Sequence, residues 1–328
     1  MSDLPEGLIE FVRRAGWGGA AVEAIPGDAS FRRYFRLRRG DGAAAMLMYA
    51  PPPEEDPQPF LLVAQWLSGN GMRAPEILAQ NPREGWLLIE DFGEDRMRDW
   101  LDAHPEDELA AYESAIDALV ELHRLPPGPF SPYDIDTYLR EALLFTQWYV
   151  PAIALKVDET GFEAAWREVL VPLAARQSPG VTVLRDYHAE NIMLLDGSPH
   201  SPQGLIDFQD ALVGHPAYDL VSLLQDARRD VPVELEAVML ARYTASIGAD
   251  HEFGGDYARL GAQRNAKIVG IFTRLHRRDG KPRYLSLIPR VWAAMERDLA
   301  HPALEPVARW FDANIPENLR RSGGGTIV

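Results

Sequence analysis

Three side chains that carry oxygen occur in an order that suits phosphate chemistry. Asp186 stands five residues before Asn191, and Asp207 comes after two short apolar runs, Ile192–Leu195 and Gly204–Phe208, which flank a turn. These runs predict a hairpin, and because a hairpin brings its ends together we expect the three side chains to converge. Phosphoryl transfer from ATP needs a carboxylate to orient the acceptor hydroxyl, and oxygen ligands for Mg²⁺. The spacing therefore predicts Asp186 as catalytic base and Asn191 and Asp207 as Mg²⁺ ligands.

Each of these residues has an ordinary structural explanation when it is taken alone. An isolated aspartate before an apolar hairpin is usually a turn or cap residue. His188, between Asp186 and Asn191, is of a type that is more often packed and hydrogen-bonded than catalytic. Asp219, further along, either caps the helix that follows it or braces the loop. Only the ordered set of Asp186, Asn191 and Asp207 is specific.

That set resembles a known superfamily. The run Asp186-x-His188-x-x-Asn191, then Ile206-Asp207-Phe208 and the stretch Gly214–Leu220, is similar to the aminoglycoside phosphotransferases, which include choline-kinase-like enzymes. The resemblance implies the roles just given to Asp186, Asn191 and Asp207, and it implies that His188 and Asp219 support the catalytic loop. It also implies a protein-kinase-like fold.

The surrounding elements fit two lobes, in the α+β class. Strand-like runs at 31–37, 46–50 and 86–90, with a helix at 60–67, predict a small antiparallel sheet and one packed helix after a first helix at 4–15. Beyond residue 97 the pattern is helical, with helices at 110–123 and 135–149 and others to about 313, interrupted by a β-like island at 181–208. We expect a nucleotide-binding N-lobe with its hinge at 1–92 and a mostly helical catalytic and substrate-binding C-lobe at 93–328.

The expected nucleotide lobe departs from the usual kinase pattern. Neither G-x-x-x-x-G-K-S/T nor G-x-G-x-x-G occurs, so the sequence supports neither a P-loop nor a Rossmann site. We expect residues 27–33 to cover the phosphates, through backbone amides, the Ser30 hydroxyl and Arg32 or Arg33, although both arginines could also be solvated strand residues. We expect the backbone at Glu90 and Phe92 to bind adenine.

The usual lysine–glutamate pair of kinases is missing. Met48 stands where a kinase strand carries its lysine, and the helix at 60–67 contains no acid. Arg32 or Arg33 is the candidate for the replacing cation. A nucleotide-binding regulatory pseudokinase remains an alternative for this reason, although the intact Asp186, Asn191 and Asp207 argue against it.

Further motifs resemble one branch of the superfamily, the bacterial anomeric kinases of N-acetylmuramate and N-acetylglucosamine. The similar segments are 28–35, 148–151, 184–191, 208–211, 225–230 and 264–272. The resemblance implies phosphorylation of the sugar C1 hydroxyl to an α-1-phosphate, in peptidoglycan recycling. Kinases of another small alcohol, such as an aminoglycoside, choline or homoserine, form the second alternative.

A basic stretch of the sequence could bind an acidic sugar. Residues 264–290 hold eight basic side chains and one acid, Asp279. With helical spacing, Arg264 and Arg274 border an apolar stripe and could bind the lactyl carboxylate of muramate, or the stretch could be a solvated face paired with acids elsewhere. Trp148 and Tyr149 could stack on a sugar ring or pack in the core.

Composition limits the partners. Among 328 residues, 33 basic and 49 acidic side chains give a formal charge of −16, which repels nucleic acid and anionic membranes. There is no cysteine, and we find neither a signal peptide nor an apolar run long enough for a membrane span. We expect a cytoplasmic, monomeric enzyme whose partners are ATP, Mg²⁺ and a small amino sugar.

Overall fold

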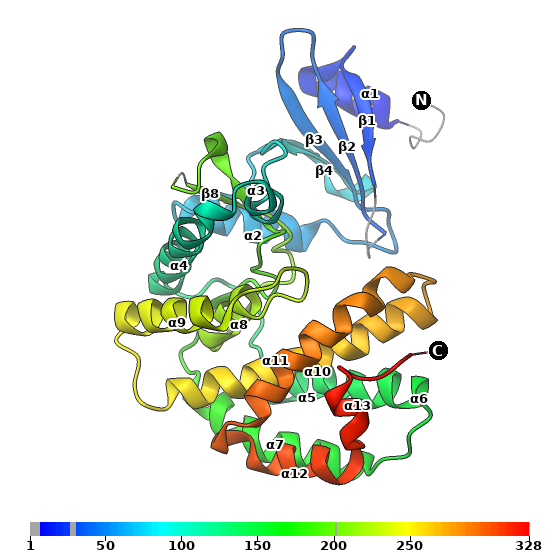
Figure 1. Cartoon of the computed structure of the whole chain (residues 1–328). Helices are drawn as coiled ribbons and strands as arrows, with labels where there is room; N and C mark the ends of the chain where they lie inside the picture. The colour runs from blue at the N-terminus through cyan, green and yellow to red at the C-terminus, as the bar shows by residue number, and fades with distance from the viewer. Residues whose placement is uncertain (1–6, 27–30, 201, 328) are drawn as a thin grey trace. The chain divides into compact units, whose positions relative to one another are not determined.

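The computed structural model describes residues 7–26, 31–200 and 202–327 (Figure 1). The chain divides into two compact units, the first formed by Met1–Trp100 with Asn191–Asp210 and the second by Leu101–Glu190 with Ala211–Val328. The first holds an antiparallel sheet and the second is mostly helical, so the expected α+β fold class is confirmed.

The sheet of the first unit has the strand order β1-β2-β3-β5-β4, with every neighbouring pair antiparallel. Alternate residues of its strands pack with α1 in one apolar cluster, because successive side chains of a strand point to opposite faces. The elements are α1 (Leu8–Val12), β1 (Ala21–Ile25), β2 (Arg33–Arg38), β3 (Ala44–Tyr49), α2 (Gln58–Gly69), β4 (Ile77–Asn81) and β5 (Trp86–Glu90).

The sequence located β2, β3, β5 and α2 correctly but missed two strands. β1 is exposed at four of its five positions and β4 is exposed at alternate positions, so neither has a continuous apolar run. The first helix is shorter than expected, since α1 ends at Val12 and a wider π-helical turn, Arg13–Trp17, follows it. Residues 4–6 of the expected helix lie outside the described part.

A short hairpin from the middle of the chain belongs to the first unit. It consists of β7 (Ile192–Leu194) and β8 (Gln203–Leu205), paired antiparallel as expected. The Leu205 N–H donates to the Arg73 carbonyl at 2.8 Å, and the Leu194 N–H donates to the Asp95 carbonyl at 2.8 Å. The first unit therefore extends past the expected boundary at residue 92 and includes residues that the sequence assigned to the C-lobe.

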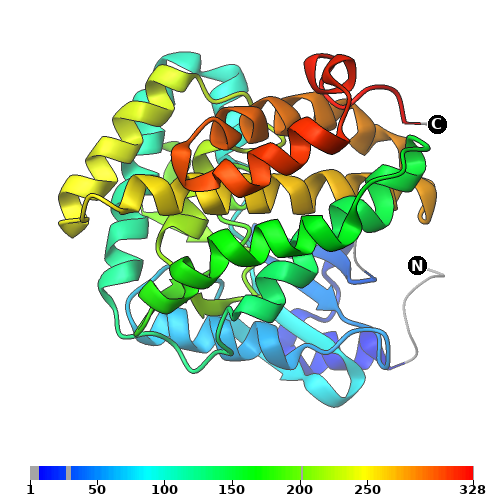
Figure 2. The ribbon, with the colours of Figure 1, turned by 90° about the horizontal axis from the view of Figure 1, so that it is seen from below.

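The second unit is built around one long, buried helix. α10 (Phe253–Arg277) packs against α5, α8 and α11, and it runs beside α11 in both ribbon views (Figures 1 and 2). The other elements are α4 (Glu108–Arg124), α5 (Ile135–Ala142), α6 (Val150–Ala152), α7 (Glu159–Arg176), α8 (Ala217–Leu224), α9 (Val233–Ile247), α11 (Ile288–Leu299), α12 (Glu305–Asn314) and α13 (Glu317–Arg321), with strands β6 (Val181–Val183) and β9 (Leu212–Gly214). Helix α3 (Met97–Ala103) precedes α4.

The helix expected at 110–123 is present as α4 and buries one side of its surface. Ile116, Leu119, Val120 and His123 of α4 are all buried. The helix expected at 135–149 instead ends at Ala142, and a π-helical turn, Phe145–Tyr149, follows it.

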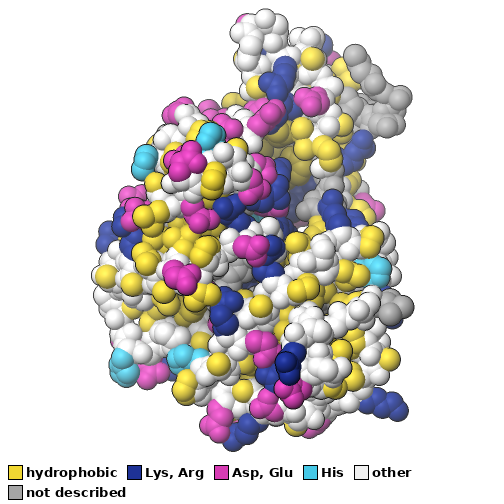
Figure 3. All heavy atoms as spheres, viewed as in Figure 1, with side chains coloured by type: hydrophobic (Ala, Val, Ile, Leu, Met, Phe, Trp, Pro, Cys, Tyr) yellow, Lys and Arg dark blue, Asp and Glu magenta, His cyan; other side chains and the backbone are white. Residues whose placement is uncertain are grey.

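The surface carries charges of both signs. On the face shown in Figure 3, acidic and basic side chains are interspersed. Within the described residues, no helix combines the length and the apolar character that crossing a membrane requires.

Candidate active site

The loop that carries Asp186 is braced by a buried carboxylate. Asp219, in the first turn of α8, accepts hydrogen bonds from the backbone N–H groups of Leu184 at 2.6 Å and Arg185 at 2.8 Å. Arg185 has a left-handed backbone with φ 73°, which a side chain adopts only when its surroundings require it. Asp219 thus lies against the loop and accepts two of its backbone hydrogen bonds.

Asp186 lies next to an arginine that faces away from solvent. Nη2 of Arg264 is 3.5 Å from Oδ1 of Asp186, and it also donates to Oγ of Ser222 at 2.8 Å. The Arg264 side chain is 5% exposed and that of Asp186 is 45% exposed. Arg264 therefore holds the expected base in place and leaves little of its own side chain exposed for a substrate.

The pKa of Asp186 results from two opposing effects. Burial raises it, but the cations Arg264, Lys267 and Arg185 outweigh burial and lower the pKa to about 2. The carboxylate is therefore ionised at neutral pH, as an acceptor of a hydroxyl proton must be.

His188 packs beneath the same loop. It is buried, and its Nε2 lies 3.1 Å from Nη1 of Arg228. Burial lowers the pKa of His188 to about 4, so the ring is neutral and accepts this hydrogen bond. Asp226 accepts a hydrogen bond from the Ala189 N–H at 3.3 Å, and Arg228 pairs with Glu190 at 3.0 Å. His188 is thus a packed, hydrogen-bonded residue of the loop.

Several basic side chains of the stretch 264–290 form ion pairs with acidic side chains. Lys267 lies 3.1 Å from Glu141, a buried carboxylate that also binds Arg185. Arg278 pairs with Asp279, and Arg290 pairs with Asp230. Pairing with acids elsewhere, one of the two explanations left open by the sequence, therefore accounts for these positions.

Arg274 differs from its neighbours on α10. Within the described residues it makes no ion pair, and its buried Nε has no hydrogen-bond partner. Burial lowers the pKa of Arg274, and the nearby Arg278 lowers it further.

The two aromatic candidates have different environments. Tyr149 is completely buried, donates its hydroxyl to the Gly324 carbonyl at 2.7 Å and packs on Phe145 and Trp292. It is a core residue, so the prediction that it contacts a sugar is wrong. Trp148 is only partly buried and keeps that possibility.

The expected metal ligands stand at the base of the β7–β8 hairpin. The Ile206 N–H donates to the Asn191 carbonyl at 3.1 Å, which holds the two hairpin ends together. Asp207 has a left-handed backbone, φ 57°, and accepts a hydrogen bond from Nε2 of Gln209 at 3.0 Å. A carboxylate and an amide oxygen are donors that suit Mg²⁺, so the residues present fit this ion.

The residues expected around the nucleotide are partly located. Nη2 of Arg32 lies 3.6 Å from Oδ1 of Asp207. Arg33 points elsewhere, with its guanidinium 5.2 Å from the centre of the Phe35 ring. Met48 is buried within β3, and Ser30 lies outside the described residues.

The expected hinge begins where β5 ends. The Glu90 N–H donates to the Glu76 carbonyl at 2.9 Å, so this N–H is already used within the protein. The Glu90 carboxylate binds Arg73 with an oxygen–nitrogen distance of 2.7 Å, which lowers the pKa of Glu90. Arg73 also lies over the Phe92 ring, 4.7 Å from its centre. Side chains thus fix the shape of this segment.

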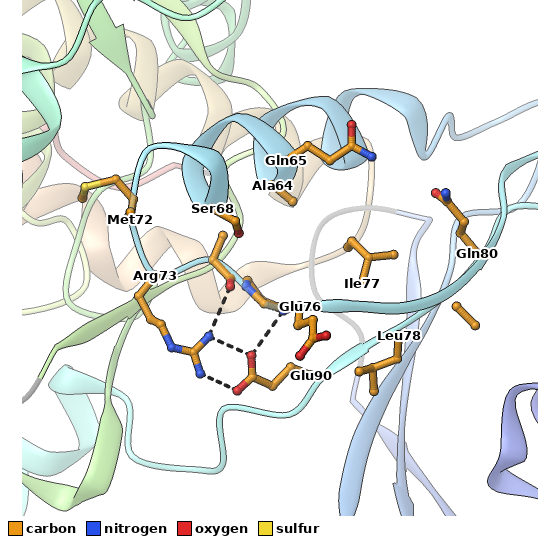
Figure 4. Close-up of a pocket in the computed structure, with 14 residues that line it drawn as sticks. Ala64, Gln65, Ser68, Met72, Arg73, Glu76, Ile77, Leu78, Gln80 and Glu90 are labelled. Atoms are coloured by element: carbon orange, nitrogen blue, oxygen red, sulfur yellow. Dashed lines mark hydrogen bonds and ion pairs between the residues drawn. The ribbon is translucent and has the colours of Figure 1, made fainter.

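A cavity of about 860 Å³ lies beside that ion pair. Figure 4 shows the Arg73 guanidinium turned toward the Glu90 carboxylate at its edge, with side chains of α2 and β4 around it. Neither Arg32, Met48 nor Asp207 lines the cavity, so it is separate from the expected phosphate and metal residues.

Sequence reasoning missed several residues of this site. Arg73, Glu55, Glu141 and Ser222 received no role, and the stretch 225–230 was noted only as a resemblance. The sequence could have indicated Glu55, because this acid lies between β3 and α2, just before the helix in which we expected the partner glutamate.

The fold defines the class of two-lobed, protein-kinase-like enzymes. Aminoglycoside phosphotransferase APH(2'')-Ib with bound ADP matches 92% of this chain and 99% of its own, with a TM-score of 0.61 and 13% identity. Choline kinase LicA from Streptococcus pneumoniae matches 92% and 99%, with a TM-score of 0.63 and 12% identity. At such low identity the likeness concerns the fold.

The chain belongs to the phosphotransferase enzyme family, whose profile matches residues 21–262. A Caulobacter vibrioides relative named N-acetylmuramate/N-acetylglucosamine kinase is 35% identical over 95% of this chain and 96% of its own. A Pseudomonas aeruginosa relative of the same name is 40% identical over 94% of each chain. The expected superfamily is thereby confirmed, and the chain is a phosphotransferase.

Proposed function

We propose that the protein is an ATP-dependent kinase of N-acetylmuramate, N-acetylglucosamine or both, which phosphorylates the anomeric C1 hydroxyl to an α-1-phosphate. The observation that carries the proposal is the 40% identity, over 94% of each chain, to a relative with that kinase name. Asp186, Asn191 and Asp207 are all present, which supports catalysis over a purely regulatory role. The reaction takes place in the cytoplasm, where ATP is made, and a monomer carries it out as part of peptidoglycan recycling.

Asp186 and the two residues at the ends of the hairpin have different roles in phosphoryl transfer. Asp186 orients the C1 hydroxyl and accepts its proton while the oxygen bonds to the γ-phosphorus and the bond to the bridging oxygen of ADP breaks. Asn191 and Asp207 hold Mg²⁺, which neutralises phosphate charge when bound. The backbone at Glu90 and Phe92 binds adenine, and the Ser30 hydroxyl and Arg32 bind the phosphates, whereas Arg33 lies over the Phe35 ring.

The electrostatics of Asp186 favour an acidic hydroxyl as acceptor. With its pKa lowered to about 2 by nearby cations, Asp186 is a weak base. The anomeric hydroxyl is more acidic than the other hydroxyls of a sugar, because the ring oxygen on the same carbon withdraws electrons. A weak base therefore suits C1 better than it suits an ordinary alcohol.

Arg274 and Trp148 are the remaining candidates for sugar contacts. Arg274 lacks an ion-pair partner within the described chain, and a carboxylate such as the lactyl group of muramate would satisfy its buried Nε. Trp148 is partly exposed and can stack on a sugar ring. Arg274→Ala should then weaken use of N-acetylmuramate more than use of N-acetylglucosamine, which lacks the lactyl group.

The direct test is product analysis. We would incubate the protein with ATP, Mg²⁺ and each amino sugar in parallel and follow the products by ³¹P NMR. A new sugar-1-phosphate signal, with loss of the reducing end, is the expected result. If folded protein that binds ATP consumed neither sugar, another alcohol acceptor would have to be sought, with aminoglycosides, choline and homoserine screened first.

A further inference from the structure

The protein lacks the lysine with which related kinases bind the phosphates of the nucleotide. In protein kinases a lysine on the third strand contacts the phosphates and is held by a glutamate from the neighbouring helix. Here Met48 on β3 is completely buried, and α2, with the sequence QPFLLVAQWLSG, contains no acid. Some other cation must do this work if the protein transfers phosphate from ATP.

Arg32 brings a guanidinium to the expected metal ligand. Its Nη2 is 3.6 Å from Oδ1 of Asp207, and its Nε is 3.8 Å from Oε2 of Glu55. Glu55 is itself fixed, because its Oε1 accepts a hydrogen bond from the Phe31 N–H at 3.1 Å. A cation thus lies between a buttressing glutamate and the metal-site aspartate, as the missing lysine would.

Strand register explains why the cation is Arg32 and not Arg33. Tyr34 of β2 lies directly opposite Met48 of β3. Arg32 directly precedes β2 and lies near Tyr34, so it is on the side of the sheet that Tyr34 and Met48 share. Arg33 falls on the other face, where it lies over the Phe35 ring. The guanidinium therefore reaches the region of the absent lysine from the adjacent strand.

The unsatisfied hydrogen-bond donors of Arg32 indicate that its guanidinium binds an anion. Its side chain is 13% exposed, and both carboxylates lie beyond hydrogen-bond length. Nε and Nη1 are buried and have no hydrogen-bond partner among the residues that the structure describes. Buried donors without partners are costly, and a guanidinium fork matches the spacing of phosphate oxygens. A phosphate would satisfy these donors, which find no partner in the described part of the chain.

We propose that Arg32 and Glu55 replace the lysine–glutamate pair of related kinases. Arg32 binds the phosphates of the nucleotide, and Glu55 positions Arg32 without touching the ligand. This inference rests on the proposed function, because it requires ATP as the phosphoryl donor.

Calorimetric titration with ATP and with adenosine, both in the presence of Mg²⁺, tests the role of Arg32. Arg32→Ala should weaken ATP binding by about 10- to 100-fold, the usual loss for a charged hydrogen-bond donor, and should leave adenosine binding unchanged. Arg38→Ala is the matched control, since it removes a positive charge from the same strand at a position that is half exposed and pairs with Glu94. Equal ATP affinity in Arg32→Ala and the wild type would overturn the proposal.

Stability without ligand separates binding from a structural role. Arg32 has unsatisfied donors but also attracts Asp207 and Glu55 over long distances, so its removal should change the melting temperature of the free protein little. A large fall in that temperature would show that Arg32 is a structural cation. Restoring a lysine in Arg32→Ala/Met48→Lys should recover part of the ATP affinity, and Arg32→Lys gives the same readout without a change in the core.

Glu55 is tested by a double-mutant cycle. Glu55→Gln should weaken ATP binding less than Arg32→Ala does, and in an Arg32→Ala background it should have no further effect, because it acts through Arg32. Additive losses would show that Glu55 does not act through Arg32. If the wild type bound ATP and phosphorylated a sugar while Arg32→Ala behaved identically, only this inference would fail. If the wild type bound no ATP, the proposed function itself would fail.

Discussion

Single residues around Asp186 are arranged to keep one carboxylate ionised and correctly turned. Arg264 contacts it directly, and Asp219 holds the backbone on which it sits. Arg264 is itself anchored by Ser222, so the cation cannot swing toward solvent without losing a buried hydrogen bond. The carboxylate of Asp186, the proposed base, is therefore positioned by residues that are far from it in sequence.

Removal of the Asp186 carboxylate should remove turnover and little else. Asp186→Asn keeps the shape of the side chain but cannot accept a proton, so kcat should fall by about 10²- to 10⁴-fold. Affinity for ATP and the melting temperature should stay near the wild-type values. Steady-state kinetics with calorimetry checks this, and wild-type turnover in the variant would contradict the assignment of the base.

The role of Arg264 can be read from a pH profile. A neighbouring cation stabilises the carboxylate form, so Arg264→Ala should raise the pKa of Asp186 and move the acid limb of kcat/KM to higher pH. Arg242→Ala is a suitable control, because Arg242 pairs with Asp117 and Glu113 on the surface. A loss of kcat with an unmoved acid limb would mean that Arg264 affects packing only.

At the level of elements, α10 decides the geometry of the catalytic unit. It carries Arg264 and packs closely on the turn that begins after Leu144. A Cβ built on Gly270 would lie 2.4 Å from the backbone carbon and oxygen of Leu144. Backbone in that position cannot move aside as a flexible side chain could. The glycine is therefore needed for the close approach of the two segments.

This close approach predicts a large difference between two glycine variants of one helix. Gly270→Ala should lower the free energy of unfolding by about 1 to 3 kcal/mol or more, the range for overpacked sites. Gly254→Ala, near the start of α10 with no atom within 4 Å of its added Cβ, should leave stability unchanged or slightly higher. Urea denaturation of both variants is the measurement, and equal stabilities would show that the contact yields easily.

For the molecule as a whole, buried histidines determine a window of acid sensitivity. Burial lowers the pKa of His188 to about 4 and, with a smaller effect of His215, that of His123 to about 3. An unfolded histidine has a pKa of about 6.5. Between about pH 6.5 and 4 these histidines are therefore protonated in the unfolded chain but remain neutral in the folded chain. Stability contributed by these residues is therefore lost as the pH falls through that range.

His188→Gln should weaken this pH dependence. The contribution of His188 between pH 7.5 and 4 is about 3 kcal/mol, from a shift of about 2.5 pKa units. The difference in unfolding free energy between the variant and the wild type should thus change by that order across the range. His251→Gln is the control, since that side chain is 90% exposed. An identical pH slope in His188→Gln and the wild type would mean that His188 does not set the window.

The sequence by itself determined those features that depend on short-range pattern. Alternating and helical spacing located β2, β3, β5 and α2, and the ordered motif of Asp186, Asn191 and Asp207 indicated a phosphotransferase. Strands without an apolar run, β1 and β4, were missed because the sheet stabilises them through pairing and not through their own burial.

Only the tertiary structure decided which charged groups are paired and which lie near the proposed catalytic and metal-binding residues. Arg32 and Arg33 are neighbours in sequence, and the pairing of Tyr34 with Met48 decides which of the two is on the face of Met48. Arg264 contacts Asp186 from 78 residues away, and Tyr149 donates to a carbonyl 175 residues away. Contacts over such separations leave no local pattern, because their energy depends on the packing of whole elements.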